Sequence, residues 1–303
     1  VLVHRLDTGG GQFALRATAD LGDEHGVTIV DGADDGGQRI LFAVAALAIE
    51  VHAPVAAEPA RPAEATALDH RWTRCAASAD DLTSLWTLTD LAGGVRLRGT
   101  TTTPVQILAL ATGGCSGARL IIEAARGTSI DLILHHVALG PARASIGLEL
   151  DLAEGASVRV DELQLDDTAQ LFSLAWPRLG RDASLIWTSV GVGGQCVRSR
   201  SKGLLTGANA SLSLAGLTVL AATRQAHQYL RVEHQVGDTR SQQLFKTIVD
   251  GKAVASFDGL VAIAKGADRS AAQQTNHNLL LSPGARADTR PQLDILADDV
   301  QAA

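Results

Sequence analysis

This 303-residue chain has few aromatic residues and no methionine. Phe, Trp and Tyr together make up 3% of it, and methionine is absent even at position 1, from which we expect residues to be missing from the sequence. Alanine, leucine and valine carry most of the 46% of hydrophobic residues, while charged residues make up 19%. These fractions lie near those of globular proteins, and small or branched side chains suit a narrow, repetitive core.

The chain also lacks an excess of basic charge and any long apolar run. Its formal net charge is −7. Nucleic-acid binding needs clustered lysine and arginine, so no nucleic-acid partner is expected. The best apolar run, Ile40–Val51, is too short to span a bilayer and contains Glu50, and Val1–Ala14 carries charges unlike a signal peptide. We therefore expect a cytoplasmic protein without a membrane partner.

Three cysteines, Cys75, Cys115 and Cys196, are an odd number at wide spacing. This pattern fits neither a disulfide framework nor a paired-cysteine metal site, so reduced thiols are expected.

The chain divides into three parts by composition. Residues 1–53 mix short extended runs with glycine-rich turns and predict a small, irregular N-terminal region. Residues 54–68 are rich in proline and alanine and predict a linker or mobile loop. Residues 69–303 form the core domain, in which short apolar runs alternate in period two from about Leu85 onward.

A repeat with a period near 27 residues runs through this core. Turn residues lead directly into a strand at Ser157, Ser184 and Ser211, which are 27 residues apart, and an earlier copy begins at Ser129. The apolar positions after each serine repeat at the same offsets: Val158, Val160, Leu163 and Leu165; Leu185, Trp187, Val190 and Val192; Leu212, Leu214, Leu217 and Val219. A fixed period with strands and no helical pattern is typical of a β-solenoid.

The predicted fold is therefore all-β, a right-handed parallel β-helix core with a small irregular N-terminal region. Stacked coils align equivalent positions, so a ladder of inward side chains is expected at Ile130, Leu132, Val158, Val160, Leu185, Trp187, Leu212 and Leu214. Two later turns, Lys265–Asp268 and Pro283–Arg286, are only 18 residues apart and predict a shorter coil or an interrupted register there.

Motifs for catalysis are mostly missing. The sequence has no GxxxxGK[ST] phosphate loop, so any nucleotide hydrolysis belongs to a partner. His135 and His136 are adjacent on a predicted strand and point to opposite faces, which favours structural roles. His277 is expected in a ladder of polar side chains at a corner, with metal ligation as the alternative.

Acidic residues cluster at Asp161, Glu162, Asp166 and Asp167, and again at Asp294, Asp298 and Asp299. Paired carboxylates on a β-helix favour a carbohydrate-active enzyme, a polysaccharide lyase or hydrolase, as the alternative function. Such runs are more often a solvated surface, and aromatic residues for stacking sugar rings are few.

The segment from Val232 to Val300 resembles the closing part of the SufB/SufD core domain. The resemblance rests on VEH at Val232–His234, SQQLFKTIVDGKAVASFDGLVAIAKGA at Ser241–Ala267, and QTNHNLLLSPGARADTRPQLDILADDV at Gln274–Val300. Gly94–Leu110 is similar to the first strands of the same domain, so the resemblance covers about Leu85 to Ala303. With few cysteines, the chain is more similar to the SufD branch than to SufB.

This resemblance implies a non-catalytic scaffold for iron–sulfur cluster assembly, not an enzyme. It implies as partners a SufB-like scaffold subunit and a SufC-like ATPase, with a homodimer as a further possibility. It implies that no cofactor is bound stably by this chain alone and that an Fe–S cluster is bound transiently in the complex. The family's cysteine position falls at Ala302, and the helices that engage the ATPase would follow Ala303.

A solenoid must end, and a final coil with unpaired strand edges invites pairing with another subunit. The final alternating strand begins at Gln292. We therefore predict a subunit interface from about Gln292 to Ala303, with Leu293 and Ile295 facing inward, Asp298 and Asp299 at its rim, and Val300 within it.

Overall fold

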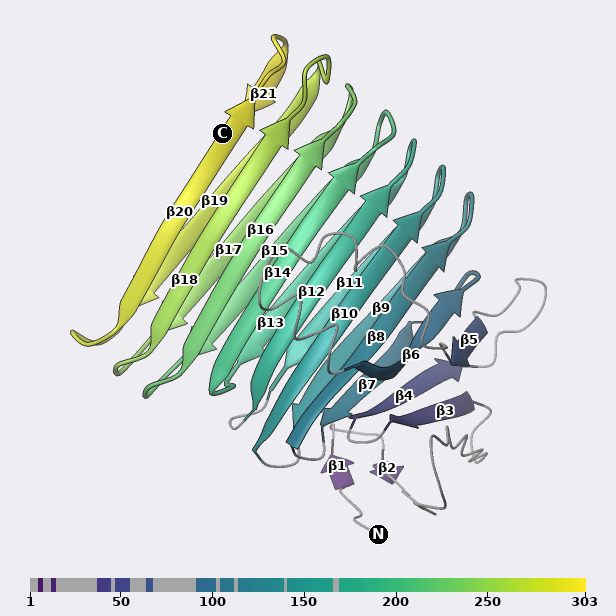
Figure 1. Ribbon diagram of the computed structural model, residues 1–303, viewed down its shortest axis with the longest axis vertical. Coiled ribbons are helices and arrows are strands. Elements are labelled where there is room, and N and C mark those ends of the chain that lie inside the picture. Colours follow the sequence, from purple (N-terminus) through teal and green to yellow (C-terminus); the bar gives the residue numbers. More distant parts are fainter. Residues whose placement is uncertain are drawn as a thin grey trace.

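The computed structural model is built of strands (Figure 1). It describes five strands before residue 91 and then residues 91–303 apart from 102–103, 112–113, 139–140 and 166–168. Within this described part, every regular element is a strand, and no helix is long and apolar enough to cross a membrane. The predicted all-β class and parallel solenoid are confirmed.

From β6 onward the chain alternates between two sheets, so consecutive strands face each other and every second strand is a hydrogen-bonded neighbour. One sheet has nine strands: β5 (Glu64–Ala67), β6 (Leu91–Arg98), β8 (Gly114–Ala124), β10 (Ala142–Leu152), β12 (Gln170–Leu179), β14 (Cys196–Leu205), β16 (Gln225–His234), β18 (Val254–Ile263) and β20 (Arg286–Ile295). We call it the even sheet, after these labels from β6 onward.

The second sheet, the odd sheet, has ten strands. They are β3 (Gly37–Val44), β4 (Leu47–Pro54), β7 (Val105–Ala111), β9 (Ser129–Ala138), β11 (Ser157–Gln164), β13 (Ser184–Val192), β15 (Ser211–Leu220), β17 (Arg240–Val249), β19 (Ser270–Leu280) and β21 (Val300–Ala302). A separate two-stranded sheet joins β1 (Arg5–Asp7) and β2 (Gln12–Ala14).

The strands of the N-terminal region extend the two sheets in the opposite sense. β4 pairs antiparallel with β7, and β5 pairs antiparallel with β6, whereas the core strands from β6 onward pair in parallel. β5 lies inside the segment predicted as a linker, and residues 55–63 and 68 lie outside the described part. The division into domains stays a prediction.

The predicted repeat coincides with the strand register. Ser157 pairs with Ser184, and Ser184 pairs with Ser211, at the spacing of 27 residues that the sequence showed; Ser129 pairs with Ser157 one coil earlier. A left-handed backbone at the corners makes this stacking possible: Gly155, Asp182 and Asn209 have φ of 68°, 55° and 62°. Glycine, asparagine and aspartate tolerate this conformation better than other residues.

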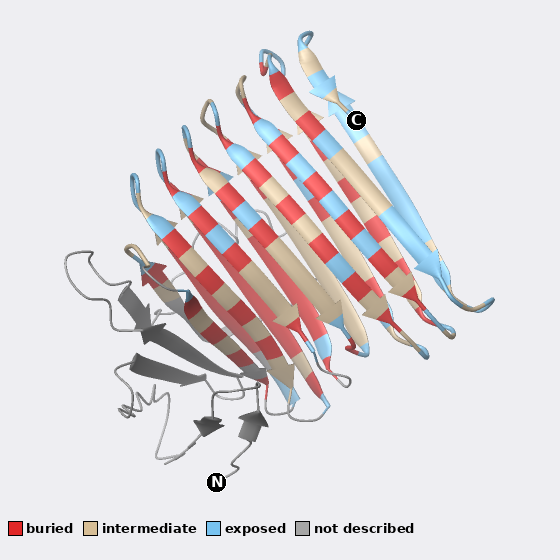
Figure 2. Cartoon of the chain, turned by 180° about the vertical axis from the view of Figure 1, so that it is seen from behind, coloured by how far each residue is buried: buried red, intermediate tan, exposed pale blue. Residues whose placement is uncertain are grey.

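The predicted inward ladder is also confirmed. All eight residues are buried, with exposed fractions between 0% for Ile130 and 7% for Trp187. The alternation of buried and less buried residues along the strands is visible in Figure 2. The third and fourth apolar positions of each repeat lie on the outer face instead. Of these, Leu217 is 37% and Val192 is 41% exposed. Leu163 lies three positions after Val160, and an odd step along a strand reverses the face.

The expected shortening near the end of the solenoid is wrong. Arg240 pairs with Ala271, so the coil there is 31 residues long, longer than the coils at Ser157 and Ser184. The turns at Lys265–Asp268 and Pro283–Arg286 join β18 to β19 and β19 to β20. They are therefore opposite corners of one coil, and their spacing of 18 does not measure a coil.

Candidate functional site

The last coil of the solenoid leaves strand edges open. β20 pairs only with β18, and β21 pairs with β19 only through Ser270–Ala272. The second half of β19 therefore has a hydrogen-bonded neighbour strand on one side only. The same holds for the whole length of β20. Unpaired edges of this kind are templates for adding strands from another chain.

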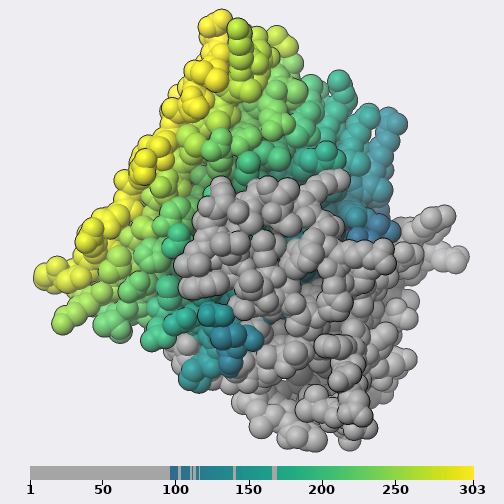
Figure 3. All heavy atoms as spheres, in the orientation of Figure 1, coloured from purple at the N-terminus to yellow at the C-terminus, as the bar shows by residue number. Residues whose placement is uncertain are grey.

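Large apolar side chains gather on the same coil. Six exposed residues belong to it: Leu279, Leu280, Leu281, Leu293, Ile295 and Leu296. Three of them continue ladders that are buried one coil earlier, because Leu280 pairs with Val249, Leu293 with Val261, and Ile295 with Ile263. The three earlier residues are at most 1% exposed. Figure 2 shows the change from alternating burial to exposure at the last strands, and Figure 3 shows this coil along one margin of the molecule.

The structure brings the predicted interface residues together at this end. Leu293 is 47% and Ile295 is 38% exposed, although both occupy inward positions, since β20 is the last described strand of the even sheet. Asp298 and Asp299 are exposed. Val300 is partly buried against the cluster formed by Val261, Ile263, Ala267 and Ala272.

A second candidate site lies inside the solenoid, where interior rows change from apolar to polar. In the even sheet one row runs Ile146, Ser173, Ser199, Gln228 along successive strands. In the odd sheet the facing row runs Leu134, Glu162, Ser189, Gly216. If the interior served stability alone, we would expect the aliphatic rows to continue, because buried polar groups are costly without hydrogen bonds.

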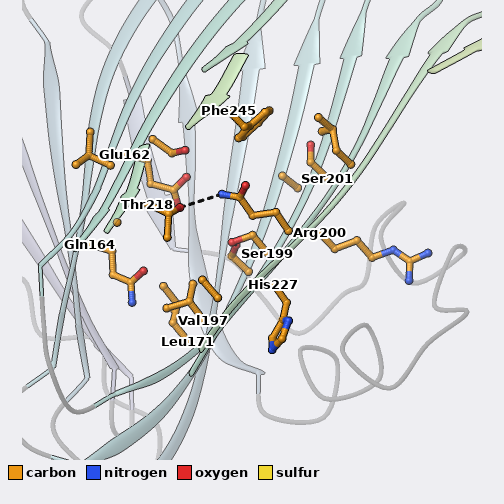
Figure 4. A pocket seen from close by; sticks show the side chains of 18 of the residues that line it. Glu162, Gln164, Leu171, Val197, Ser199, Arg200, Ser201, Thr218, His227 and Phe245 are labelled. Carbon is orange, nitrogen blue, oxygen red and sulfur yellow. Dashed lines mark hydrogen bonds between the residues drawn. The ribbon is translucent and has the colours of Figure 1, made fainter. Parts of the chain in front are cut away.

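These short polar side chains leave a cavity of about 110 Å³, shown in Figure 4. Phe245 lines it, and its ring centroid lies 5.2 Å from that of Phe257 in the facing sheet. Gly216 makes room for this ring: a methyl group there would lie 2.5 Å from a Phe245 ring carbon. We call this space the polar chamber.

Glu162 is the carboxylate of the polar chamber, and its side chain is 15% exposed. One carboxylate oxygen lies 2.8 Å from His136 Nε2, and the other accepts a hydrogen bond of 3.0 Å from Trp187 Nε1. Glu162 is thereby held between the preceding and the following coil. His135 and His136 do point to opposite faces, as predicted, and His136 has the structural role of contacting Glu162.

Some polar atoms around the polar chamber have no hydrogen-bond partner within the described residues. They include the Nε2 of Gln164, a residue only 5% exposed, and the Oγ of Ser201. Thr218 accepts a long hydrogen bond of 3.4 Å from Gln228 across the same space (Figure 4). A water molecule needs roughly 10–15 Å³ by this measure and two to four polar partners. The polar chamber therefore has the size and polarity to hold ordered water.

Within the described residues, the acidic clusters bring no three carboxylates together. Asp161 and Glu162 are adjacent on β11, and only Glu162 points inward. Asp166 and Asp167 lie outside the described residues. His277 is exposed within β19 rather than at a corner, opposite Lys246. No group of three or more metal-ligating side chains occurs in the described part of the chain, and Cys115 and Cys196 there are free thiols. Cys75 lies outside it.

His234, in the VEH segment, is a buried histidine that the sequence did not single out for a role. It is 0% exposed, with Nδ1 2.7 Å from Thr239 Oγ1 and Nε2 2.9 Å from Ser241 Oγ. These two hydroxyl groups satisfy both ring nitrogens. Burial without a counter-charge lowers the pKa of His234 to about 4.

This histidine predicts a loss of stability in acid. In the unfolded chain His234 takes up a proton near pH 6.5, while in the folded chain it stays neutral down to about pH 4. The unfolded state therefore binds more protons in that window, and the free energy of unfolding should fall by about 3 kcal/mol between pH 6.5 and pH 4 from this group. Urea denaturation at several pH values measures it. His234→Gln should flatten the dependence, whereas His277→Gln, at an exposed site, should leave it; equal slopes for all three proteins would contradict the assignment.

Comparisons with known proteins now decide the family. Residues 108–303 match the family model "SUF system FeS cluster assembly, SufBD core domain", which contains both the repeat and the open last coil. The chain belongs to the SufB/SufD family. It is 32% identical to the iron–sulfur cluster assembly protein SufD of Escherichia coli over 183 residues, which cover 59% of this chain and 43% of that protein. This match confirms the predicted SufD-like branch.

Two shorter matches agree with this family. A SufBD family protein of Synechocystis is 42% identical over 87 residues, covering 28% of this chain and 19% of that protein. The chloroplastic protein ABCI7 of Arabidopsis thaliana is 39% identical over 82 residues, covering 26% of this chain and 16% of that protein. The chain thus spans less than half the length of these curated relatives.

Proposed function

We propose that this SufD-like chain is a non-catalytic scaffold subunit that assembles iron–sulfur clusters together with a SufB-like sister subunit and a SufC-like ATPase, in the cytoplasm. The observation that carries the proposal is the match of residues 108–303 to the SufBD core domain, over the same coils whose last member is open and apolar. The cluster in this scheme is cargo, bound transiently where subunits meet.

The open last coil supports pairing with another scaffold subunit. A second solenoid end can add its strands to β20 and to the free half of β19, while covering Leu280, Leu293 and Ile295. A sister subunit is the proposed occupant, and a second copy of this chain could use the same edges. The exposed Asp298 and Asp299 would then lie at the rim, where unpaired carboxylates stay in water.

Co-expression with candidate sister and ATPase subunits tests the assembly. The chain should co-purify with the sister subunit and recruit the ATPase into one complex. ATP hydrolysis should require the ATPase, because this sequence has no phosphate loop. Recovery of the chain alone, with the other two subunits associated without it, would contradict the scaffold role.

Anaerobic reconstitution tests the cargo assignment. The isolated chain should retain far less than one cluster per molecule after desalting, because Cys115 and Cys196 belong to different strands and no histidine, cysteine and carboxylate cluster occurs among the described residues. Iron and sulfide analysis measures it. A cluster bound one to one by the lone chain, and lost when its cysteines are replaced, would show a resident cofactor instead.

A further inference from the structure

The outer face of the even sheet carries a concentration of positive charge that the scaffold role does not explain. On β14 the outward positions include Arg198, Arg200 and Lys202, and on β16 they include Arg231. These four cations contrast with the net charge of −7 of the chain as a whole. Long-range attraction here favours a negatively charged ligand.

A groove of about 210 Å³ runs through this region. Its charged lining consists of Arg200, Lys202, Arg231 and one carboxylate, Asp258. Trp176 and Tyr229 add two aromatic rings, and Leu260 adds an aliphatic side chain. We call this feature the outer groove. It adjoins the polar chamber across β12, β14 and β16, because Ala175, Ser201 and Leu230 line both, and it is separate from the open last coil.

The outer groove is long rather than compact. Its lining residues come from β12, β14, β16, β18 and β20, which are consecutive neighbours in the even sheet. Four spacings of about 4.8 Å give a length of roughly 19 Å. An extended peptide rises about 3.3 Å per residue, so about six residues would fill it. A single phosphate or carboxylate would reach only one or two of the cations.

The cations at its centre keep donors for a ligand. Lys202 and Arg231 are register partners on adjacent strands, and like charges directly opposite each other are unfavourable without an anion. Glu233 supplies part of that anion: it lies 2.7 Å from Arg231 Nε and 3.5 Å from Lys202 Nζ. These contacts use one of the five N–H donors of a guanidinium and one side of an ammonium. The two side chains are 50% and 36% exposed.

Asp258 is the carboxylate among the described residues that line the outer groove. Its carboxylate accepts a hydrogen bond of 2.9 Å from Gln292 Nε2 and lies 3.7 Å from Arg290 Nη1. Arg290 on β20 offsets the negative charge of Asp258, which therefore cancels less of the positive charge on β14 and β16. Rings, cations and an aliphatic contact therefore follow one another from β12 to β18.

We propose that the outer groove binds an extended, acidic segment of a partner protein, with carboxylates on Lys202 and Arg231 and apolar side chains on Trp176 and Leu260. Charge complementarity and the length of the groove select this occupant over a small anion. The site goes beyond the proposed scaffold function and uses neither the open last coil nor any cluster ligand.

Fluorescence anisotropy of a labelled six-residue peptide, in which glutamate alternates with leucine, tests the proposal on this chain. The acidic peptide should bind, with affinity falling as NaCl rises from about 50 to about 300 mM. A peptide of alternating lysine and leucine should not. The double variant Lys202→Glu, Arg231→Glu should raise the Kd at least about tenfold, and the Gln, Gln variant should fall between.

Arg159→Glu with Arg240→Glu is the matched control. Both arginines are exposed on the odd sheet, and the change in net charge is the same, so the Kd should stay within about twofold. If both double variants lost the same affinity for the peptide, the effect would reflect overall charge, and the proposed site would be wrong. So would displacement of the peptide by an equal concentration of inorganic phosphate, which would indicate a small-anion site, or failure of the acidic peptide to bind. Pairing with the sister subunit should be unchanged in the Lys202, Arg231 variants, so this test and that of the scaffold function fail independently.

Discussion

Ending the chain at Gln292 is expected to abolish its pairing with a sister scaffold subunit. The truncation removes the last residues of β20 and all of β21, and with them the apolar surface at Leu293 and Ile295. Charge reversal at Asp298 and Asp299 should weaken pairing only about two- to fivefold, because exposed ion pairs contribute little. Titration calorimetry between the separately purified subunits measures both.

A full-length variant separates the interface from the fold. Replacing Leu293 and Ile295 with lysine keeps β20 and β21 but puts two charges on the surface to be buried, which should lower the affinity by more than about 100-fold. The melting temperature should change little, since both residues are already exposed. A truncated chain that stays folded and pairs as tightly as the intact one would place the interface elsewhere.

Truncation of one residue of the inward ladder is expected to have the largest effect on stability. Leu212 is 1% exposed and pairs with the buried Leu185 of the preceding coil. It packs so close to the facing sheet that a methyl group on Gly203 would lie 2.7 Å from its Cδ2 atom. Leu212→Ala should therefore leave a cavity and lower the free energy of unfolding by roughly 2–5 kcal/mol.

Leu217→Ala is the matched control, because it makes the same chemical change on the same strand. Leu217 lies on the outer face and is 37% exposed, so its loss should cost less than about 1 kcal/mol. Urea denaturation followed by circular dichroism compares the two variants. Similar costs at both positions would mean that the two faces of β15 are assigned wrongly.

The sequence predicted the fold because the signals are local and repeated. Alternation along a strand and turn residues before each serine are properties of a few neighbouring residues, and a period of 27 aligns them from coil to coil. The same alternation held the information that Leu163 and Leu217 face outward, since each lies an odd number of residues from the inward ladder. The corner turns were harder to assign, because both corners of a coil use the same turn residues.

The two candidate sites differ in how well they could be predicted from the sequence. The open last coil was predictable from the family motifs and from the rule that a solenoid must end. Leu293 is exposed there because β20 is the last described strand of the even sheet. The polar chamber was not. Glu162 meets His136 and Trp187 across two neighbouring coils, at separations of 26 and 25 residues, so its contacts reach diagonally past the register partner.

The sequence by itself determined the all-β repeat, the inward ladder and the resemblance to the SufB/SufD family, because each depends on residues close together in the chain or on a constant period. Only the tertiary structure decided the outer groove. Its residues come from five strands, each separated from the next by a full coil, and an outward-facing lysine or tryptophan carries no local signal of its neighbours. Stacking brings Trp176, Lys202 and Arg231 onto one face, because register in a solenoid is set by the buried ladders and not by the outward-facing residues.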